Sequence, residues 1–193
     1  RGCAAALSLA CALGVWSFFG ELQSAHAGTG NNKRGTVNAL QQMRDHALKA
    51  GRKRVTLGLV HSGTLHDASL VDMLIFDAGV RVAAPNLQLK RRRGSLVVQP
   101  LVVDPWAWVP LRGAKAPAIT PEMWAQRLSA EADYVLILAG GRSQNRRQGR
   151  WPPWVEASEL LRASPVFRPL GSVFNVPSDG PVELLVRREF RPD

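Results

Sequence analysis

The sequence has almost no cysteine, with only Cys3 and Cys11 among its 193 residues. Both lie in an N-terminal stretch that we expect to be removed, so the remaining chain would have neither a disulfide nor a reactive thiol. Its stability must then come from the packing of an apolar core. The 166 residues from Gly28 onward are enough for one domain that buries about two thirds of its unfolded surface.

Long hydrophobic runs are also missing. The most apolar stretch, residues 4–19, is 16 residues long, which is shorter than the roughly 20 residues that cross a bilayer as a helix. The small residues Ala25 and Ala27 that follow it match the specificity of signal peptidase. We therefore expect residues 1–27 to be a Sec-type signal peptide, cleaved between Ala27 and Gly28, and the protein to be periplasmic or secreted.

Two other interpretations of this N-terminus are an uncleaved membrane anchor and a lipoprotein. The lipoprotein is disfavoured because the position three residues before Cys11, where a leucine is usual, is occupied by Ser8. The chain begins with Arg1 rather than Met, so we expect the first residues of the gene product to be missing. After Gly28 no apolar run reaches the length of a membrane-spanning helix, and we expect a soluble domain without a transmembrane segment.

Acidic residues and lysine are scarce. The 15 Asp and Glu are outnumbered by 25 Lys and Arg, of which only five are Lys, and the net charge is +10. Removal of residues 1–27 would take away one basic and one acidic residue, so this charge would persist. Such an excess favours adhesion to polyanions such as anionic lipid, acidic cell-wall polymer, lipopolysaccharide or nucleic acid. An arginine-rich genome composition is the alternative explanation.

Hydrophobic periodicity and capping residues predict alternating helices and strands. Gly51 is a natural helix stop, and Thr120-Pro121-Glu122 is typical of a helix start. Residues 65–78 are predicted as a helix, although 73–76 and 80–84 could instead form a hairpin. The other predicted helices cover 37–50 after a Thr36 cap, 121–131 and 156–163, and the predicted strands cover 55–60, 80–84, 87–90, 95–98, 134–139, 171–176 and 182–190.

This order indicates an α/β fold with a small mixed sheet, helices packed on it, and antiparallel strands toward the C-terminus. We expect a single domain over residues 28–193. Residues 87–90 and 95–98 are predicted to pair as a hairpin around Arg91-Arg92-Arg93-Gly94. The five prolines between Pro100 and Pro121 predict an irregular loop at about 100–121, because proline lacks the N–H donor that a sheet interior needs.

Three strand entries carry a resemblance to a known group of proteins. They are Arg54-Val55-Thr56-Leu57, Gly79-Val80-Arg81-Val82 and Ala132-Asp133-Tyr134-Val135-Leu136. In outline the chain resembles the small α/β domains of bacterial envelope assembly proteins. The resemblance covers less than half of the chain and implies only a fold, so no functional residue is transferred from it.

The first candidate site is the His61–Asp67 turn, which follows the predicted buried strand 55–60. It contains two imidazoles, two hydroxyls and a carboxylate, and open α/β sheets place their ligands at such strand ends. His61, Ser62, His66 and Asp67 could supply a base, a nucleophile and an orienting acid. The Gly-x-Ser-x-Gly pattern is absent, however, so helix capping with solvated histidines is the simpler interpretation. His46, in the first helix, has no partner that the sequence identifies.

The second candidate site combines cations with indoles. We call residues 142–154 the Arg/Trp segment, and Lys90, Arg91, Arg92 and Arg93 the basic tip. Guanidinium groups pair with phosphates and carboxylates, and indoles stack on flat rings. Tryptophan between prolines can instead pin a loop onto the core. The expected contact residues of the Arg/Trp segment are Arg142, Arg146, Arg147, Arg150, Trp151 and Trp154.

We expect a non-catalytic binding or accessory module of the bacterial cell envelope rather than an enzyme. Its partner would be an anionic envelope polymer, lipid headgroups or an acidic protein, and nucleic acid is not expected for an exported protein. One alternative is a periplasmic hydrolase or transferase that uses the His61–Asp67 turn. Another is a structural subunit of an envelope assembly machine that docks through Trp106 and Trp108. No cofactor or metal is expected, because GxGxxG, a Walker lysine and HExxH are all absent.

Overall fold

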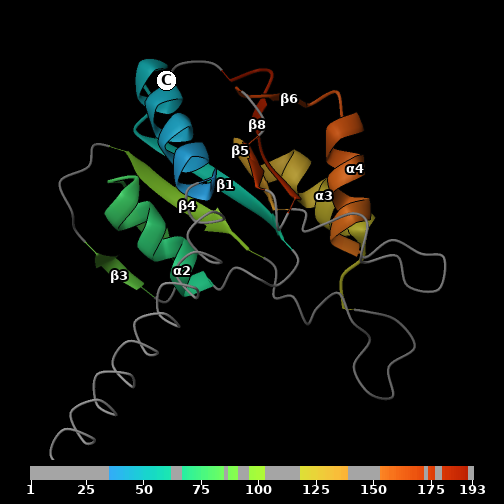
Figure 1. Ribbon diagram of the computed structural model, residues 1–193, viewed down its shortest axis with the longest axis horizontal. Coiled ribbons are helices and arrows are strands. Elements are labelled where there is room, and N and C mark those ends of the chain that lie inside the picture. Colours follow the sequence, from blue (N-terminus) through green and yellow to red (C-terminus); the bar gives the residue numbers. More distant parts are fainter. Residues whose placement is uncertain are drawn as a thin grey trace, which may run out of the picture. The chain divides into compact units, whose positions relative to one another are not determined.

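The computed structural model describes residues 35–61, 67–84, 87–90, 96–102, 118–138, 153–171, 174–176 and 180–190. These residues form a mixed sheet with helices on both faces (Figure 1), which confirms the predicted α/β fold with antiparallel strands toward the C-terminus. The strands are β1 (Arg54–His61), β2 (Arg81–Ala84), β3 (Leu87–Lys90), β4 (Val97–Leu101), β5 (Tyr134–Leu138), β6 (Phe167–Pro169), β7 (Phe174–Val176) and β8 (Gly180–Arg187).

The helices follow the predicted order. The N-terminal helix covers residues 35–49, so Thr36 lies inside it rather than at its cap. The predicted helix at 65–78 is confirmed over the hairpin alternative, as α2 (Asp67–Asp72) continued by the π-helical turn Met73–Asp77. The last two are α3 (Pro121–Glu131) and α4 (Pro153–Ala163). In α3 the Thr120 hydroxyl accepts a hydrogen bond from the Met123 N–H, as the predicted cap requires.

The sheet order is β3-β2-β4-β1-β5-β8-β6, with β7 also paired to β8. The four inner strands β2, β4, β1 and β5 are parallel, and β3 and β8 add to them in antiparallel orientation. The predicted strand 171–176 is observed in part as β7, whereas β6 was not predicted from the sequence. Strands β6 and β7 pair with different ends of β8, since Phe167 lies opposite Arg187 and Phe174 lies opposite Val182.

The predicted hairpin between residues 87–90 and 95–98 is wrong. Strand β3 pairs with β2, with Val82 opposite Lys90, while β4 inserts between β2 and β1. Only two residues separate β2 from β3, the connection length that a hairpin prefers. Pro100 lies in β4 rather than in an irregular loop, opposite Leu57 and beyond the last pair between β4 and β2. A sheet tolerates proline where a strand has only one partner.

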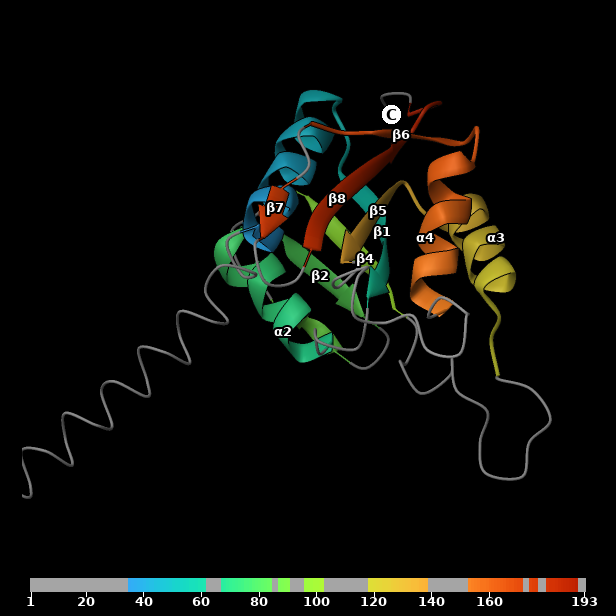
Figure 2. The same cartoon turned by 45° about the vertical axis from the view of Figure 1, so that its right-hand side comes forward.

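Successive residues of β1 serve two different cores, because side chains alternate across a strand. Val55, Leu57 and Leu59 face the N-terminal helix and α2, whereas Val60 belongs to the cluster built on α3 and α4. Figure 2 shows the N-terminal helix (blue) and α2 (green) on one side of the sheet, and α3 and α4 on the other. The fold is therefore a three-layer α/β arrangement, and both cores depend on β1.

The two helices on the first face are joined by polar contacts as well as by apolar packing. The N-terminal helix ends at Gly51, whose φ of 77° permits the left-handed conformation that closes the helix, with the Arg52 N–H bonded to the Ala47 carbonyl at 3.0 Å. Gln41 donates to the carbonyl of Asp77 and Arg44 donates to that of Ala78. These side chains satisfy carbonyls that the end of a helix leaves unpaired.

On the second face, α3 lies directly against the backbone of β1. A Cβ atom added to Gly58 would overlap Cδ2 of Leu128 and lie 3.3 Å from Cβ of Ala132. The Trp124 indole N–H donates to the Leu59 carbonyl at 3.1 Å. The missing side chain at Gly58 is therefore what allows this close approach.

We expect Gly58→Ala to lower the free energy of unfolding by about 1–3 kcal/mol, because the added methyl group overpacks a buried contact. Leu128→Ala alone should cost about 2–5 kcal/mol by leaving a cavity. The double variant should lose less than the sum of the two, since the methyl group added at position 58 enters the vacated space. Urea unfolding of the four proteins measures this coupling, and strictly additive losses would contradict the close approach.

Candidate functional site

The carboxyl ends of the four parallel strands lie along one edge of the sheet, which we call the carboxyl edge. From β1 the chain continues to α2 on the first face, whereas from β4 and β5 it continues to α3 and α4 on the second face. Strands β4 and β5 are the two neighbours of β1, and the helix that follows each of them lies on the face opposite to α2. Open α/β sheets bind ligands at such a topological switch point.

The chain leaves the carboxyl edge just before each sequence-predicted site. The His61–Asp67 turn starts at the last residue of β1, and β5 ends at Leu138, four residues before the Arg/Trp segment begins. These strand ends are neighbours, because His61 is paired with Leu138. The Pro-rich stretch follows β4, which ends earlier, beside Gly58 of β1.

His61 is buried, with 1% of its surface exposed, so the simpler interpretation of a solvated histidine does not apply to it. Its odd-numbered position places it on the side of Val55, Leu57 and Leu59, the face covered by the N-terminal helix and α2. Asp67 begins α2, while Ser62 and His66 lie outside the described residues. The arrangement of nucleophile and base therefore stays a prediction.

Of the expected binding residues, Trp154 is the one whose side chain the structure describes. It is half-buried and packs against the core on the second face, and its carbonyl accepts a hydrogen bond from the Ser158 hydroxyl at 2.6 Å. Trp154 thus anchors the end of the Arg/Trp segment. Lys90 is the last residue of β3, the outermost strand on one side of the sheet. The remaining expected contacts lie outside the described residues: Arg91, Arg92, Arg93, Arg142, Arg146, Arg147, Arg150 and Trp151.

Helix α4, in which the Arg/Trp segment ends, is joined to the sheet by an ion pair. Arg162 of α4 donates to both carboxylate oxygens of Glu183 in β8, at 2.7 and 3.0 Å. A bidentate pair of this kind restrains both side chains. On the other side of the segment, the last described residue is Leu138 at the end of β5.

We expect Trp154→Ala to lower the free energy of unfolding by roughly 1–3 kcal/mol, because it removes an indole packed on the core. Trp151→Ala, the neighbouring change within the same segment, should leave stability nearly unchanged if Trp151 serves contact with a ligand. Thermal unfolding of the two variants makes the comparison. Equal losses would show that both indoles are structural.

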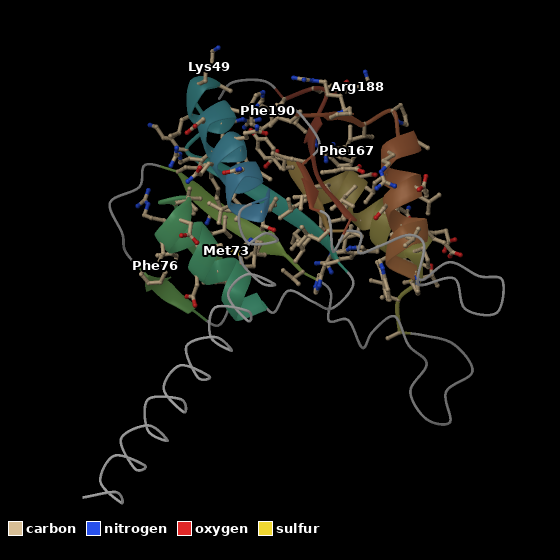
Figure 3. The ribbon with its side chains drawn as sticks, viewed as in Figure 1. Lys49, Met73, Phe76, Phe167, Arg188 and Phe190 are labelled. Carbon is tan, nitrogen blue, oxygen red and sulfur yellow. The ribbon has the colours of Figure 1, made fainter. Side chains whose placement is uncertain are left out.

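The opposite edge, which we call the amino edge, carries a group of cations that the sequence analysis did not assign to a site. The edge contains the start of β1, the start of β6 and the end of β8, because β8 runs antiparallel to β5. Figure 3 shows Lys49, Arg188 and Phe190 at the same end of the molecule. The cations are Lys49, Arg52, Lys53, Arg54, Arg168, Arg187 and Arg188, of which Arg52 and Arg187 are half-buried and the others exposed.

An aromatic cluster lies among these cations. The Nδ1 atom of His46 is 2.8 Å from the hydroxyl of Tyr134, the first residue of β5. The ring of Phe190 lies 5.3 Å from the His46 ring and 5.0 Å from the Tyr134 ring, centre to centre. The guanidinium of Arg52 lies 4.9 Å from the centre of the Phe190 ring. His46 therefore has a partner, and three aromatic rings and a cation form one contact group.

The surroundings of this cluster lower the pKa of His46 and raise the pKa of Tyr134. Burial lowers the pKa of His46 below its ordinary value of 6.5, and the positive charges of Arg168 and Lys49 lower it further. Burial, followed by the Asp133 carboxylate, raises the pKa of Tyr134 above its ordinary value of 10.0. Both directions fit a neutral imidazole whose Nδ1 accepts a hydrogen bond from the protonated Tyr134 hydroxyl.

Sequence reasoning missed this cluster because His46 and Tyr134 are 88 residues apart and share no motif. The one local signal is the basic run Arg52-Lys53-Arg54, which directly precedes the predicted strand 55–60. Within the described ranges, no group of three or more His, Cys, Asp or Glu could hold a metal ion. In the same part of the chain, no helix combines the length and apolarity needed to cross a membrane.

The described residues thus define a three-layer α/β protein with a switch point at one edge of its sheet and a cationic, aromatic cluster at the other. Comparison with models of protein families, with curated proteins and with solved structures gives no significant match in any of the three.

We expect the protein to lose stability as the pH falls from about 8 to about 5. Because folding lowers the pKa of His46, the unfolded state binds more protons near and below pH 6.5, and the stability present above that value is lost on acidification. His46→Gln, which stays neutral, should flatten this dependence. Urea unfolding across the pH range measures it, and parallel curves for the two proteins would exclude His46 as the cause.

Proposed function

We propose that this chain is an exported, non-catalytic binding or accessory module for an anionic component of the bacterial cell envelope. The observation that carries the proposal is that the chain leaves β5 at Leu138, at the carboxyl edge beside the switch point, before the Arg/Trp segment, and that Trp154 of α4 packs on the second core at the end of the segment. Ligands of open α/β sheets bind at this place, and here the adjoining sequence is rich in arginine.

The chemistry of the segment supports an anionic ligand. Arg142, Arg146, Arg147 and Arg150 offer planar donors that pair with phosphate or carboxylate oxygens, and Trp151 offers a flat face for a sugar ring. The net charge of +10 raises the local concentration of polyanions around the whole molecule. A segment that lies between two described elements, β5 and α4, also loses less conformational entropy on binding than a free tail does.

A second candidate function is hydrolysis or group transfer at the His61–Asp67 turn. The observation in its favour is that the buried His61 lies at the end of β1, the strand at the switch point. This function requires the Ser62 hydroxyl to come within hydrogen-bond reach of an imidazole. Loss of activity toward a model ester in Ser62→Ala would support it, and full retention would exclude a serine mechanism.

We expect the chain from Gly28 onward to bind peptidoglycan or vesicles rich in anionic lipid, and to bind less as salt increases. Changing Arg146, Arg147 and Trp151 together to Ala should weaken binding by more than tenfold, because two cations and one stacking surface are lost. Co-sedimentation across a salt series measures both effects.

The control for this experiment is a variant that loses the same charge elsewhere. Arg127 and Glu131 form an exposed pair on α3, so Arg127→Gln with Gln126→Glu removes two units of positive charge without touching either edge of the sheet. If this control weakens binding as much as the triple variant does, net charge explains the binding and the Arg/Trp segment has no special role.

A further inference from the structure

The amino edge carries exposed cations that no described carboxylate neutralises. Lys49, Lys53, Arg54, Arg168 and Arg188 are exposed, and none of them forms an ion pair with a carboxylate within the described ranges. One neighbouring acid, Asp133, accepts a hydrogen bond from the Thr56 N–H at 2.7 Å, and Glu189 is exposed between Arg188 and Phe190. The edge therefore keeps a clear positive excess.

These cations are spread both along the amino edge and across the two faces of the sheet. Along the edge they extend from β1 to β6, which in this sheet is three strand spacings, or about 14 Å. Across the sheet, Arg168 lies opposite Val186 on the side of the N-terminal helix. Arg187 lies on the other side, where its guanidinium donates to the carbonyls of Ala132 and Ser129. Such a field of charge matches a planar array of anions better than a single extended chain.

Part of this surface is held rigid by the fold. Besides the two hydrogen bonds of Arg187, Nε of Arg188 donates to the Phe167 carbonyl at 3.0 Å. Arg52 lies against the Phe190 ring, and Lys49 ends the N-terminal helix with its side chain directed away from the ribbon (Figure 3). Side chains that are already ordered lose little entropy when they meet a ligand.

From this placement we propose that the amino edge is a membrane-binding surface that receives the phosphate groups of anionic lipid headgroups. Guanidinium groups suit phosphate because their planar donors match its oxygens. The proposal concerns the edge opposite the Arg/Trp segment and does not depend on that segment.

The test uses the chain from Gly28 onward, which contains every described element, and vesicles of phosphatidylglycerol mixed with phosphatidylcholine. Lys53→Gln, Arg54→Gln and Arg168→Gln together remove three cations that make no described hydrogen bond. Each cation near an anionic surface contributes about fivefold in affinity, so the triple variant should bind on the order of 100-fold more weakly. Thermal unfolding verifies that the variant is folded.

The matched control is Arg127→Gln with Gln99→Glu and Gln126→Glu, which lowers the charge by the same three units at exposed positions outside the amino edge. It should lose much less affinity than the triple variant. Equal losses in both variants, or equal binding to vesicles of phosphatidylcholine alone, would overturn the proposal.

Two further arms distinguish the source of the anion. Inorganic phosphate, added at constant ionic strength, should not displace the protein from vesicles if a lipid surface is the partner, and displacement at millimolar concentration would show a site for free phosphate instead. Soluble polyphosphate that binds more tightly than vesicles would show a polymer site. The Arg146, Arg147 and Trp151 variant in the same assay separates the two edges, because vesicle binding lost only in that variant overturns this proposal and leaves the proposed function standing.

Discussion

The rest of the structure depends on the double burial of β1. Its odd-numbered residues, among them Leu57 and Leu59, pack beneath the N-terminal helix and α2, and Gly58 and Val60 pack beneath α3. The strand also has a parallel partner on each side, so its backbone hydrogen bonds are made within the sheet. One strand of eight residues thereby holds two cores together and extends from the amino edge, where described basic residues gather, to the switch point at the carboxyl edge.

The elements themselves could be predicted from the sequence, because their signals are local. Thr120 and Pro121 define the start of α3, Gly51 ends the N-terminal helix, and the apolar runs at β1 and β5 were both recognised. The position of β4 could not be predicted, because strand pairing depends on contacts between segments far apart in sequence. Strand β3 forms its hairpin with β2, from which only two residues separate it. The turn-like residues 91–94 between β3 and β4 instead predict a hairpin of β3 with β4.

For the candidate sites, too, local features could be predicted from the sequence and contacts between distant segments could not. That the His61–Asp67 turn follows a buried strand was predictable from the β-branched and apolar residues before it, and the structure adds that this strand lies at the switch point. The contact between His46 and Tyr134 was not predictable, since only the packing of the N-terminal helix on β5 brings them together. Trp154 illustrates a third case. Its sequence context allowed both contact with a ligand and anchoring to the core, and the structure shows the half-buried indole packed against the second core.

The insertion of β4 between β2 and β1 has a consequence for the order in which the chain can fold. The two neighbours of β1 are β4 and β5, so an N-terminal fragment that ends before Val97 leaves both sides of β1 without the strands that pair with it in the sheet. Strand β5 in turn needs β8, which lies almost at the end of the sequence. The central sheet therefore closes late in synthesis, because contacts of such long sequence separation form slowly and require nearly the whole chain.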